Sequence, residues 1–195
     1  MTPDEVLDFW FPAAALAVNH RRWFNGGPAL DRDIADRFGA AIEHAGHGAY
    51  DDWTQTARGR LALIVLLDQF PRNAWRGTPR AYAWDENAVG ECLAGMREGA
   101  DAGLSLVERL FFYLPLLHSE QRSHQDLSVG CMKALWRAAA AEERPYFARW
   151  RIVARRQRAL LRCFGRFPHR NVVLGRRSNA AEKLFLVALR LRHRH

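Results

Sequence analysis

The sequence predicts an all-α fold, and three observations carry the prediction. Apolar residues recur at helical spacing in nearly every segment, and two capping boxes mark helix starts. No stretch alternates with period two for long enough to indicate a sheet. We therefore expect about seven to eight helices joined by short loops.

The first helices are predicted from their start signals. Thr2-Pro3-Asp4-Glu5 is a capping box with proline at the first helical position, so a helix should begin here and continue through Trp10. A loop should follow at Pro12. A second loop, NGGP (25–28), leads to Asp31 as the N-cap of the next helix. The apolar face of that helix is made by Ile34, Phe38, Ile42 and Ala45.

The middle of the chain contains the most apolar helix. Leu61–Leu67 is apolar all round, which predicts a central, buried helix. After Pro71, the turn RGTP (76–79) precedes a helix with an apolar face formed by Ala88, Val89, Cys92, Leu93 and Met96. Ser105 and Glu108 form the second capping box, which opens the segment LVERLFFYLP.

The last third is predicted to hold three helices. The first runs through Met132, with Val129 and Trp136 on the same face. Pro145 can open a long basic helix that reaches about Cys163 and has Gly165 at its C-cap. Ser178 should cap the final helix. We expect one domain over residues 1–190 and a frayed basic tail over residues 191–195.

Bulk properties indicate a globular cytoplasmic protein. A chain of 195 residues with 49% apolar and 26% charged residues can bury a core without disulfides or metal. Its longest apolar runs, 61–67 and 110–117, are too short to cross a bilayer, and its acidic start lacks the features of a secretory signal. The three cysteines lie far apart, which is typical of reduced core thiols.

Charge is distributed unevenly along the chain. Residues 149–195 contain 14 Lys and Arg against one acid, a net charge of +13, and the rest of the chain carries −5. Such a segment could bind nucleic acid, but 27 of the 29 basic residues are Arg at helical spacing, mixed with apolar residues. Arginine stems also cover apolar surface, so a solvated helix face is the favoured interpretation and nucleic acid an unlikely partner.

Four stretches together resemble a known family: DFWF (8–11), LALIVLLDQFPRN (61–73), PLLHSEQRSHQ (115–125) and FGRFPHRNVVLGR (164–176). The chain resembles the bacterial family catalogued as domain of unknown function 924. The resemblance implies a right-handed helical array like a tetratricopeptide-repeat superhelix, and no established activity or catalytic residue. It also shows two departures. Gln157 stands where the family often has histidine, and the last helix opens with Ser178-Asn179-Ala180-Ala181-Glu182 in place of Ser-Thr and paired acids.

The motif Phe-Pro followed by Arg-Asn occurs twice, in FPRN (70–73) and FPHRN (167–171). A structural interpretation is that Phe-Pro ends a helix, after which the arginine folds back on free carbonyls. In the functional interpretation, the two ends meet across a concave face and Arg72 and Arg170 bind a carboxylate or phosphate. The sequence leaves both interpretations open.

The densest polar stretch is HSEQRSHQD (118–126), which directly follows an apolar run. A neutral histidine near a carboxylate can act as an acid–base unit, which makes His118 and Glu120 candidates. The spacing matches no zinc motif, so no metal is expected, and Ser119 is a poor nucleophile candidate because chain neighbours rarely form a triad. The structural alternative is that Ser119 or Ser123 caps a helix.

Asp68 interrupts an apolar helix, where a lone carboxylate would be costly, so it should pair with Arg72 or Arg170. We therefore predict a polar cleft that binds a small anionic molecule without a cofactor, with metal-independent acid–base or hydrolytic chemistry if the protein is an enzyme. The alternatives are a helical scaffold for a protein partner and nucleic-acid binding through the basic third. The candidate catalytic residues are His118, Glu120 and His169, and the candidate ligand-binding residues are Asp68, Arg72, Asn73, Arg76, Gln125, Arg170, Asn171 and Arg176.

Overall fold

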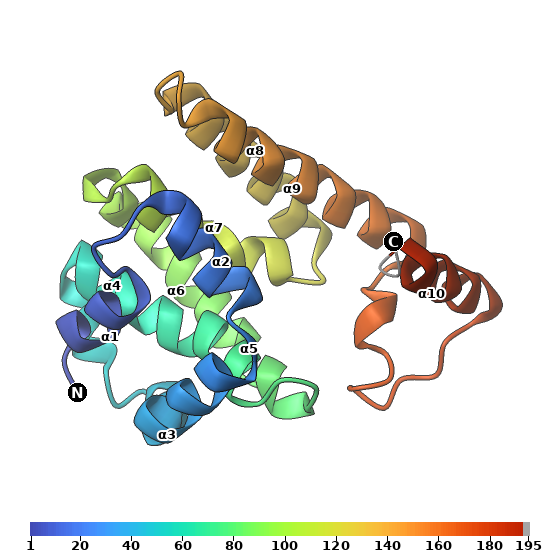
Figure 1. Cartoon of the computed structure of the whole chain (residues 1–195), viewed down its shortest axis with the longest axis horizontal. Helices are drawn as coiled ribbons and strands as arrows, with labels where there is room; N and C mark the ends of the chain where they lie inside the picture. The colour runs from blue at the N-terminus through green and yellow to red at the C-terminus, as the bar shows by residue number, and fades with distance from the viewer. Residues whose placement is uncertain (193–195) are drawn as a thin grey trace. The chain divides into compact units, whose positions relative to one another are not determined.

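The computed structural model describes residues 1–192, and this part of the chain is helical with no strand (Figure 1). The all-α prediction is confirmed. The α-helices are α1 (Pro3–Trp10), α2 (Leu16–Asn25), α3 (Gly27–Gly46), α4 (Ala57–Ile64), α5 (Phe70–Ala74), α6 (Asp85–Glu98), α7 (Leu106–His118), α8 (Arg122–Ala138), α9 (Arg144–Phe164) and α10 (Ala180–Arg192). A π-helical turn, η2 (Val65–Gln69), joins α4 to α5. Short 3₁₀ helices are η1 (Asp51–Gln55), η3 (Pro79–Tyr82), η4 (Ala100–Gly103) and η5 (Pro168–Arg170).

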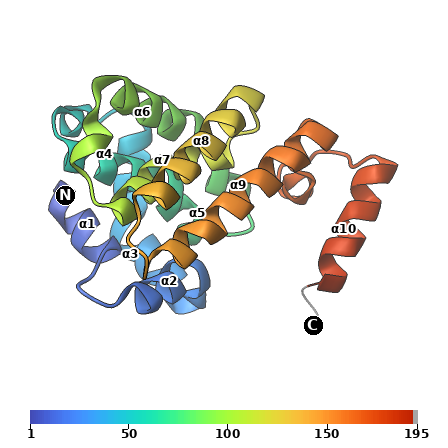
Figure 2. The same ribbon diagram turned by 90° about the horizontal axis from the view of Figure 1, so that it is seen from above.

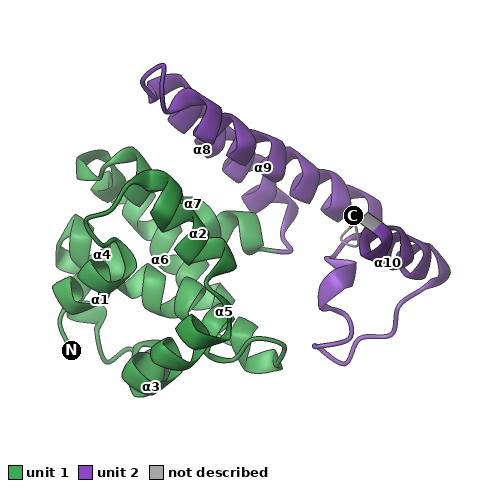
Figure 3. Cartoon of the chain, viewed as in Figure 1, with its two compact units in different colours: residues 1–119 green, residues 120–195 purple. Residues whose placement is uncertain are grey.

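The chain divides into two compact units, residues 1–119 and residues 120–195 (Figure 3). The boundary follows the end of α7, where Ser119 takes an extended conformation. A division into compact units does not decide whether each part folds alone, so the single domain over residues 1–190 stays a prediction.

Unit 1 is built around α4 and α7. Every side chain from Leu61 to Leu67 is at most 2% exposed, as predicted for a central helix. The N-terminal helix packs its aromatic face on this core, since Trp10 makes edge contacts with Phe70 and Phe111 at centroid distances of 5.4 and 5.8 Å. Burial of these large apolar side chains supplies most of the driving force for folding.

Unit 2 is organised by the pair α8 and α9, which lie side by side (Figure 2). Pro145 stands in the first turn of α9, and Gly165 ends that helix in the left-handed conformation at φ 71°, both as predicted. Phe147 and Leu161 are buried on the inner face of α9. The last helix, α10, packs mainly on η5.

Several local predictions are wrong. Asp31 is not an N-cap, because α3 already begins at Gly27 with Pro28 in its first turn. Helix α2 stands where only loops were predicted. The side chain that caps α10 is Asn179 and not Ser178, since Asn179 accepts from the Glu182 amide at 2.9 Å. The N-cap position of α8 is occupied by Gln121 and not by Ser119 or Ser123.

Two further expectations concern cysteine and the tail. Cys92 and Cys131 are buried as predicted, but Cys163 is exposed near the end of α9. Leu191 and Arg192 still belong to α10, although they were predicted to fray. The remainder of that prediction, residues 193–195, lies outside the described residues.

The two Phe-Pro motifs have different backbone structures, so the shared explanation that Phe-Pro ends a helix is wrong. Phe70 and Pro71 begin α5, which continues directly from the π-turn. Phe167 is extended and Pro168 opens a 3₁₀ turn, after α9 has already ended at Phe164. The same residues therefore serve as a helix start in one unit and as a turn in the other.

A buried Asp–His pair and the polar clusters around it

The π-turn places a carboxylate inside unit 1. Pro71 has no N–H to donate to the preceding turn, and the chain widens there so that the Phe70 amide bonds the Val65 carbonyl five residues back. Asp68 lies within this widened turn with 0% of its surface exposed. A buried charge of this kind is tolerated only with good partners.

His118 is the closest charged or titratable partner of Asp68. It is the last residue of α7, and its Nδ1 lies 2.8 Å from Oδ1 and 3.0 Å from Oδ2 of Asp68. The Gln69 amide also donates to this carboxylate. Because an ionised carboxylate only accepts hydrogen bonds, Nδ1 must carry the proton, and neutral His118 then has Nε2 as its proton acceptor. The His118 side chain is 22% exposed, so solutes can reach its edge.

The protonation states of the pair follow from burial and charge. Burial alone would raise the pKa of Asp68, but the Arg72 charge and His118 outweigh it and lower that pKa to about 2. Burial lowers the pKa of His118 below 6.5, and the Arg72 charge acts in the same direction against the opposing effect of Asp68. At neutral pH the carboxylate is therefore ionised and the imidazole neutral.

Arg72 completes this cluster. Its guanidinium lies 3.4 Å from the Asp68 carboxylate, which confirms the predicted pairing. It also donates to the Asp68 and Ala81 carbonyls, and it forms a two-pronged pair with Asp85 at 2.7 and 3.1 Å. Sequence reasoning missed Asp85, which is simply an acid in the first turn of α6 and carries no motif. With both carboxylates ionised, the cluster has a net charge of −1.

The other predicted polar residues of unit 1 bind a different acid. Arg76 forms a two-pronged pair with Asp31 at 2.7 and 2.9 Å, and the Asn73 amide donates to the same carboxylate at 2.9 Å. These contacts tie α5 to α3. The arrangement favours a structural role for Asn73 and Arg76, because an anionic ligand would have to displace Asp31.

In unit 2, Glu120 holds the second Phe-Pro motif. Its carboxylate accepts from the Phe167 amide at 2.7 Å and from Arg176 at 2.6 and 3.0 Å, and Arg176 also donates to the Phe167 carbonyl. Burial would raise the pKa of Glu120, but these hydrogen bonds lower it. Glu120 is therefore ionised at neutral pH and cannot serve as a proton donor there.

Two of the remaining candidates of unit 2 contact the Phe167 ring. The Arg170 side chain is almost fully buried, with its guanidinium 5.0 Å from the Phe167 ring centroid, and the exposed His169 ring stacks on that phenyl at 5.5 Å. Asn171 is fully buried and donates to the Ser178 hydroxyl at 3.0 Å. Gln125 is fully buried in α8.

The structure thus groups the predicted residues into three clusters. Asp68, Arg72 and His118 form one, Asn73 and Arg76 share Asp31, and the remaining candidates lie in unit 2 with Glu120 and Arg176 paired. That the two Arg-Asn pairs build one site stays a prediction. No group of three His, Cys, Asp or Glu suited to a metal ion occurs among residues 1–192.

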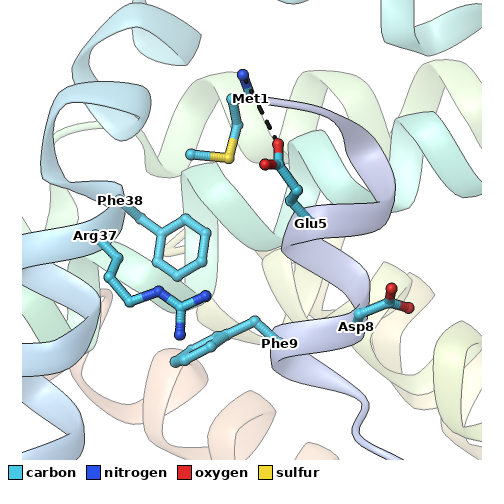
Figure 4. Close-up of a pocket in the computed structure, with 6 residues that line it drawn as sticks. All are labelled: Met1, Glu5, Asp8, Phe9, Arg37 and Phe38. Atoms are coloured by element: carbon cyan, nitrogen blue, oxygen red, sulfur yellow. Dashed lines mark ion pairs between the residues drawn. The ribbon is translucent and has the colours of Figure 1, made fainter.

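A separate hollow of about 560 Å³ opens beside the N-terminal helix (Figure 4). Its charges are mixed: the Met1 amino group lies 3.8 Å from Glu5, and the Arg37 guanidinium lies over the Phe9 ring at 4.6 Å. No predicted site residue lines it. Because both cationic and anionic groups line it, this hollow indicates no single ligand chemistry.

Comparison with known proteins agrees with the resemblance seen in the sequence. Residues 6–188 match the family described as bacterial protein of unknown function (DUF924). The chain belongs to this family. A solved structure of a protein of unknown function from Agrobacterium tumefaciens is similar to it, with 34% identity, a TM-score of 0.79, and coverage of 94% of this chain and 96% of the other. No curated protein matches.

No helix in residues 1–192 is both long and apolar enough to cross a bilayer. A cytoplasmic location stays a prediction.

Proposed function

We propose that this member of the family binds a small anionic molecule beside His118 and that His118 exchanges a proton with it. The observation that supports the proposal is the fully buried Asp68 carboxylate, which fixes the His118 tautomer through Nδ1. In this arrangement the carboxylate orients the ring and stabilises its protonated form, while Nε2 receives or returns the proton. The π-turn that contains Asp68 also supports the proposal, because π-helical turns occur frequently at functional sites.

The charges set a condition on the ligand. Arg72 already binds two carboxylates, so it adds little attraction for a further anion. Protonation of His118 raises the net charge of the cluster from −1 to zero, which removes the repulsion. An anion should therefore bind more tightly as the pH falls below the ordinary histidine value of 6.5.

A thermal-shift screen against phosphate and small carboxylates, run at pH 5.5 and pH 7.5, tests the proposal. We expect at least one anion to raise the melting temperature, with a larger shift at pH 5.5. His118→Gln should abolish the shift. His44→Gln, a change at an exposed histidine of α3, should leave it intact.

Two outcomes would overturn the proposal. One is that no anion stabilises the protein at either pH. The other is that His118→Gln retains the full shift, which would assign Asp68–His118 to structure alone. Either outcome would favour the alternatives, which are a helical scaffold for a protein partner and nucleic-acid binding through the basic third of the chain.

A further inference from the structure

A pocket of about 280 Å³ opens in unit 1 beside helix α2. The loop between α1 and α2, helix α2 itself and the start of α7 form its walls. Its volume is close to the lower end of the range for small-molecule sites, so it has room for a small, compact molecule. The lining residues that matter are Phe11, Asn19, Trp23, Ser105, Val107 and Glu108.

Aromatic side chains form one wall of this pocket. Phe11 packs edge-on against Trp23 with their ring centroids 5.7 Å apart, and both rings also contact buried Phe111. The Trp23 indole N–H donates to the Trp10 carbonyl at 2.6 Å, so this ring has no polar group left to offer. Such a wall favours an occupant with an apolar ring of its own.

The charge in the lining is already neutralised. Glu108 lies 2.6 Å from the Arg58 guanidinium, and it accepts from the Ser105 amide at 2.9 Å and from the Ser105 hydroxyl at 2.8 Å. The Ser105 hydroxyl in turn accepts from the Glu108 amide, as a capping box requires. An occupant therefore meets no unpaired charge here and should itself be neutral.

Asn19 is the polar side chain of the lining with capacity to spare. It is only 7% exposed, and its Nδ2 donates to the Pro12 carbonyl at 3.0 Å and to the Ala14 carbonyl at 3.2 Å. These two acceptors fix which end of the carboxamide is the nitrogen. Oδ1 then has no hydrogen-bond partner among the described residues. Because a buried acceptor without a donor is costly, an occupant that supplies an N–H or O–H would be stabilised there.

We propose that this pocket binds a small neutral aromatic molecule with an N–H or O–H donor. Its ring would lie against Phe11 and Trp23, and its donor would bond Oδ1 of Asn19. The proposal is independent of the function assigned to His118, because the pocket shares no residue with the Asp68–Arg72–His118 cluster. Val107 lies in the first turn of α7, whereas His118 is the last residue of that helix.

The first test compares two probes of nearly equal size on the ¹⁵N-labelled full chain. Indole has an N–H donor, and benzofuran has an oxygen in its place. We expect indole to shift the Asn19 side-chain amide and the Trp23 indole signals saturably, with a Kd of about 1 mM. Benzofuran should bind about fivefold more weakly, because it leaves the Asn19 oxygen without a donor.

A second test fills the pocket. Val107→Trp places a large side chain at a half-buried lining position and should abolish the indole shifts. Val18→Trp is the matched control, since Val18 is 49% exposed on α2 and does not line the pocket, so this variant should bind indole normally. If Val107→Trp does not fold, the comparison of indole with benzofuran on the unaltered chain decides.

Three results would overturn the proposal. The first is that indole produces no saturable shift, or produces its largest shifts at Phe9 and Phe38 in the other hollow. The second is that benzofuran binds as tightly as indole, since Asn19 then recognises no donor. The third is that a folded Val107→Trp variant binds indole as well as Val18→Trp does.

Discussion

Asp68 is the residue whose environment determines the candidate site. It is fully buried, and it has contacts with an imidazole, an amide and a guanidinium. A buried carboxylate with this set of partners is part of a hydrogen-bond network. Removal of its charge should therefore weaken its interactions with all three partners.

We predict that Asp68→Asn lowers the free energy of unfolding by about 1–3 kcal/mol, because His118 and Gln69 lose a charged hydrogen-bond acceptor while Arg72 keeps its pair with Asp85. Chemical denaturation measures this loss. Asp33→Asn is the control, since the Asp33 side chain is 47% exposed and its ion pair with Arg37 lies along the surface of its own helix. A loss for Asp68→Asn no larger than that of the control would contradict the network.

As the pH falls, the protein should lose stability in two steps, the first due to His118 and the second due to Asp68. The pKa of His118 is lower in the folded state, so the unfolded chain takes up a proton more readily and stability falls as the pH drops below 6.5. Asp68, with a folded pKa of about 2 against 3.8, adds a second loss as the pH falls from about 4 toward 2.

Denaturant titrations between pH 7.5 and about pH 2 measure both losses. His118→Gln should flatten the curve between pH 7 and pH 5 and leave the acid limb. If the variant and the unaltered chain show the same slope between pH 7 and pH 5, His118 is not the group that titrates there.

At the scale of elements, helix ends show how local chemistry fixes boundaries. Gly165 ends α9 at φ 71°, where a Cβ is strained. Gly165→Ala should therefore destabilise the protein by about 1 kcal/mol. Gly130→Ala within α8 should instead be neutral or stabilising, because its Cβ would meet nothing within 4 Å. Melting temperatures of the two variants check the contrast, and equal shifts would contradict it.

Helix α10 depends on one carboxylate. Glu182 accepts from Arg166 at 2.7 and 2.9 Å and from the Asn179 amide at 2.8 Å, and these bonds lower its pKa to about 2. Since α10 packs mainly on η5, we predict that Glu182→Gln speeds amide hydrogen exchange in α10 roughly tenfold. Exchange in α8 should stay unchanged. Equal effects in both helices would show that α10 does not open by itself.

Over the whole molecule, the two compact units differ in the sign of their net charge. Residues 1–119 carry 16 acidic and 11 basic residues, and residues 120–195 carry 5 acidic and 18 basic residues. Many of the arginines make ion pairs within their own unit, as Arg60, Arg72, Arg76, Arg166 and Arg176 do. Many arginines of this chain therefore stabilise its fold through ion pairs.

Unit 1 should fold without unit 2. It contains the fully buried segment Leu61–Leu67 and the aromatic cluster of Trp10, Phe70 and Phe111. A fragment of residues 1–119 is expected to show a helical circular dichroism spectrum and a cooperative thermal transition. An unfolded fragment would support the single domain that the sequence analysis predicts.

The helical class, and the helix boundaries that depend on neighbours in the chain, follow from the amino-acid sequence alone. Several helix ends could be predicted because each signal acts within one helical turn. They are the capping boxes at Thr2 and Ser105, the start of α9 at Pro145 and its end at Gly165. That Asp68 needs a charged partner could also be predicted, since it follows from the burial of a carboxylate in an apolar helix.

Which side chains come into contact could not be predicted before the packed fold was known. His118 reaches Asp68 across 50 positions, Arg176 reaches Glu120 across 56, and Asp85 was not a candidate before its contact with Arg72 was known. The repeated Phe-Pro motif makes the same point, because one copy begins a helix after a π-turn and the other forms a 3₁₀ turn. Such outcomes depend on how helices pack, and packing is set by the whole set of side chains at an interface and not by local spacing.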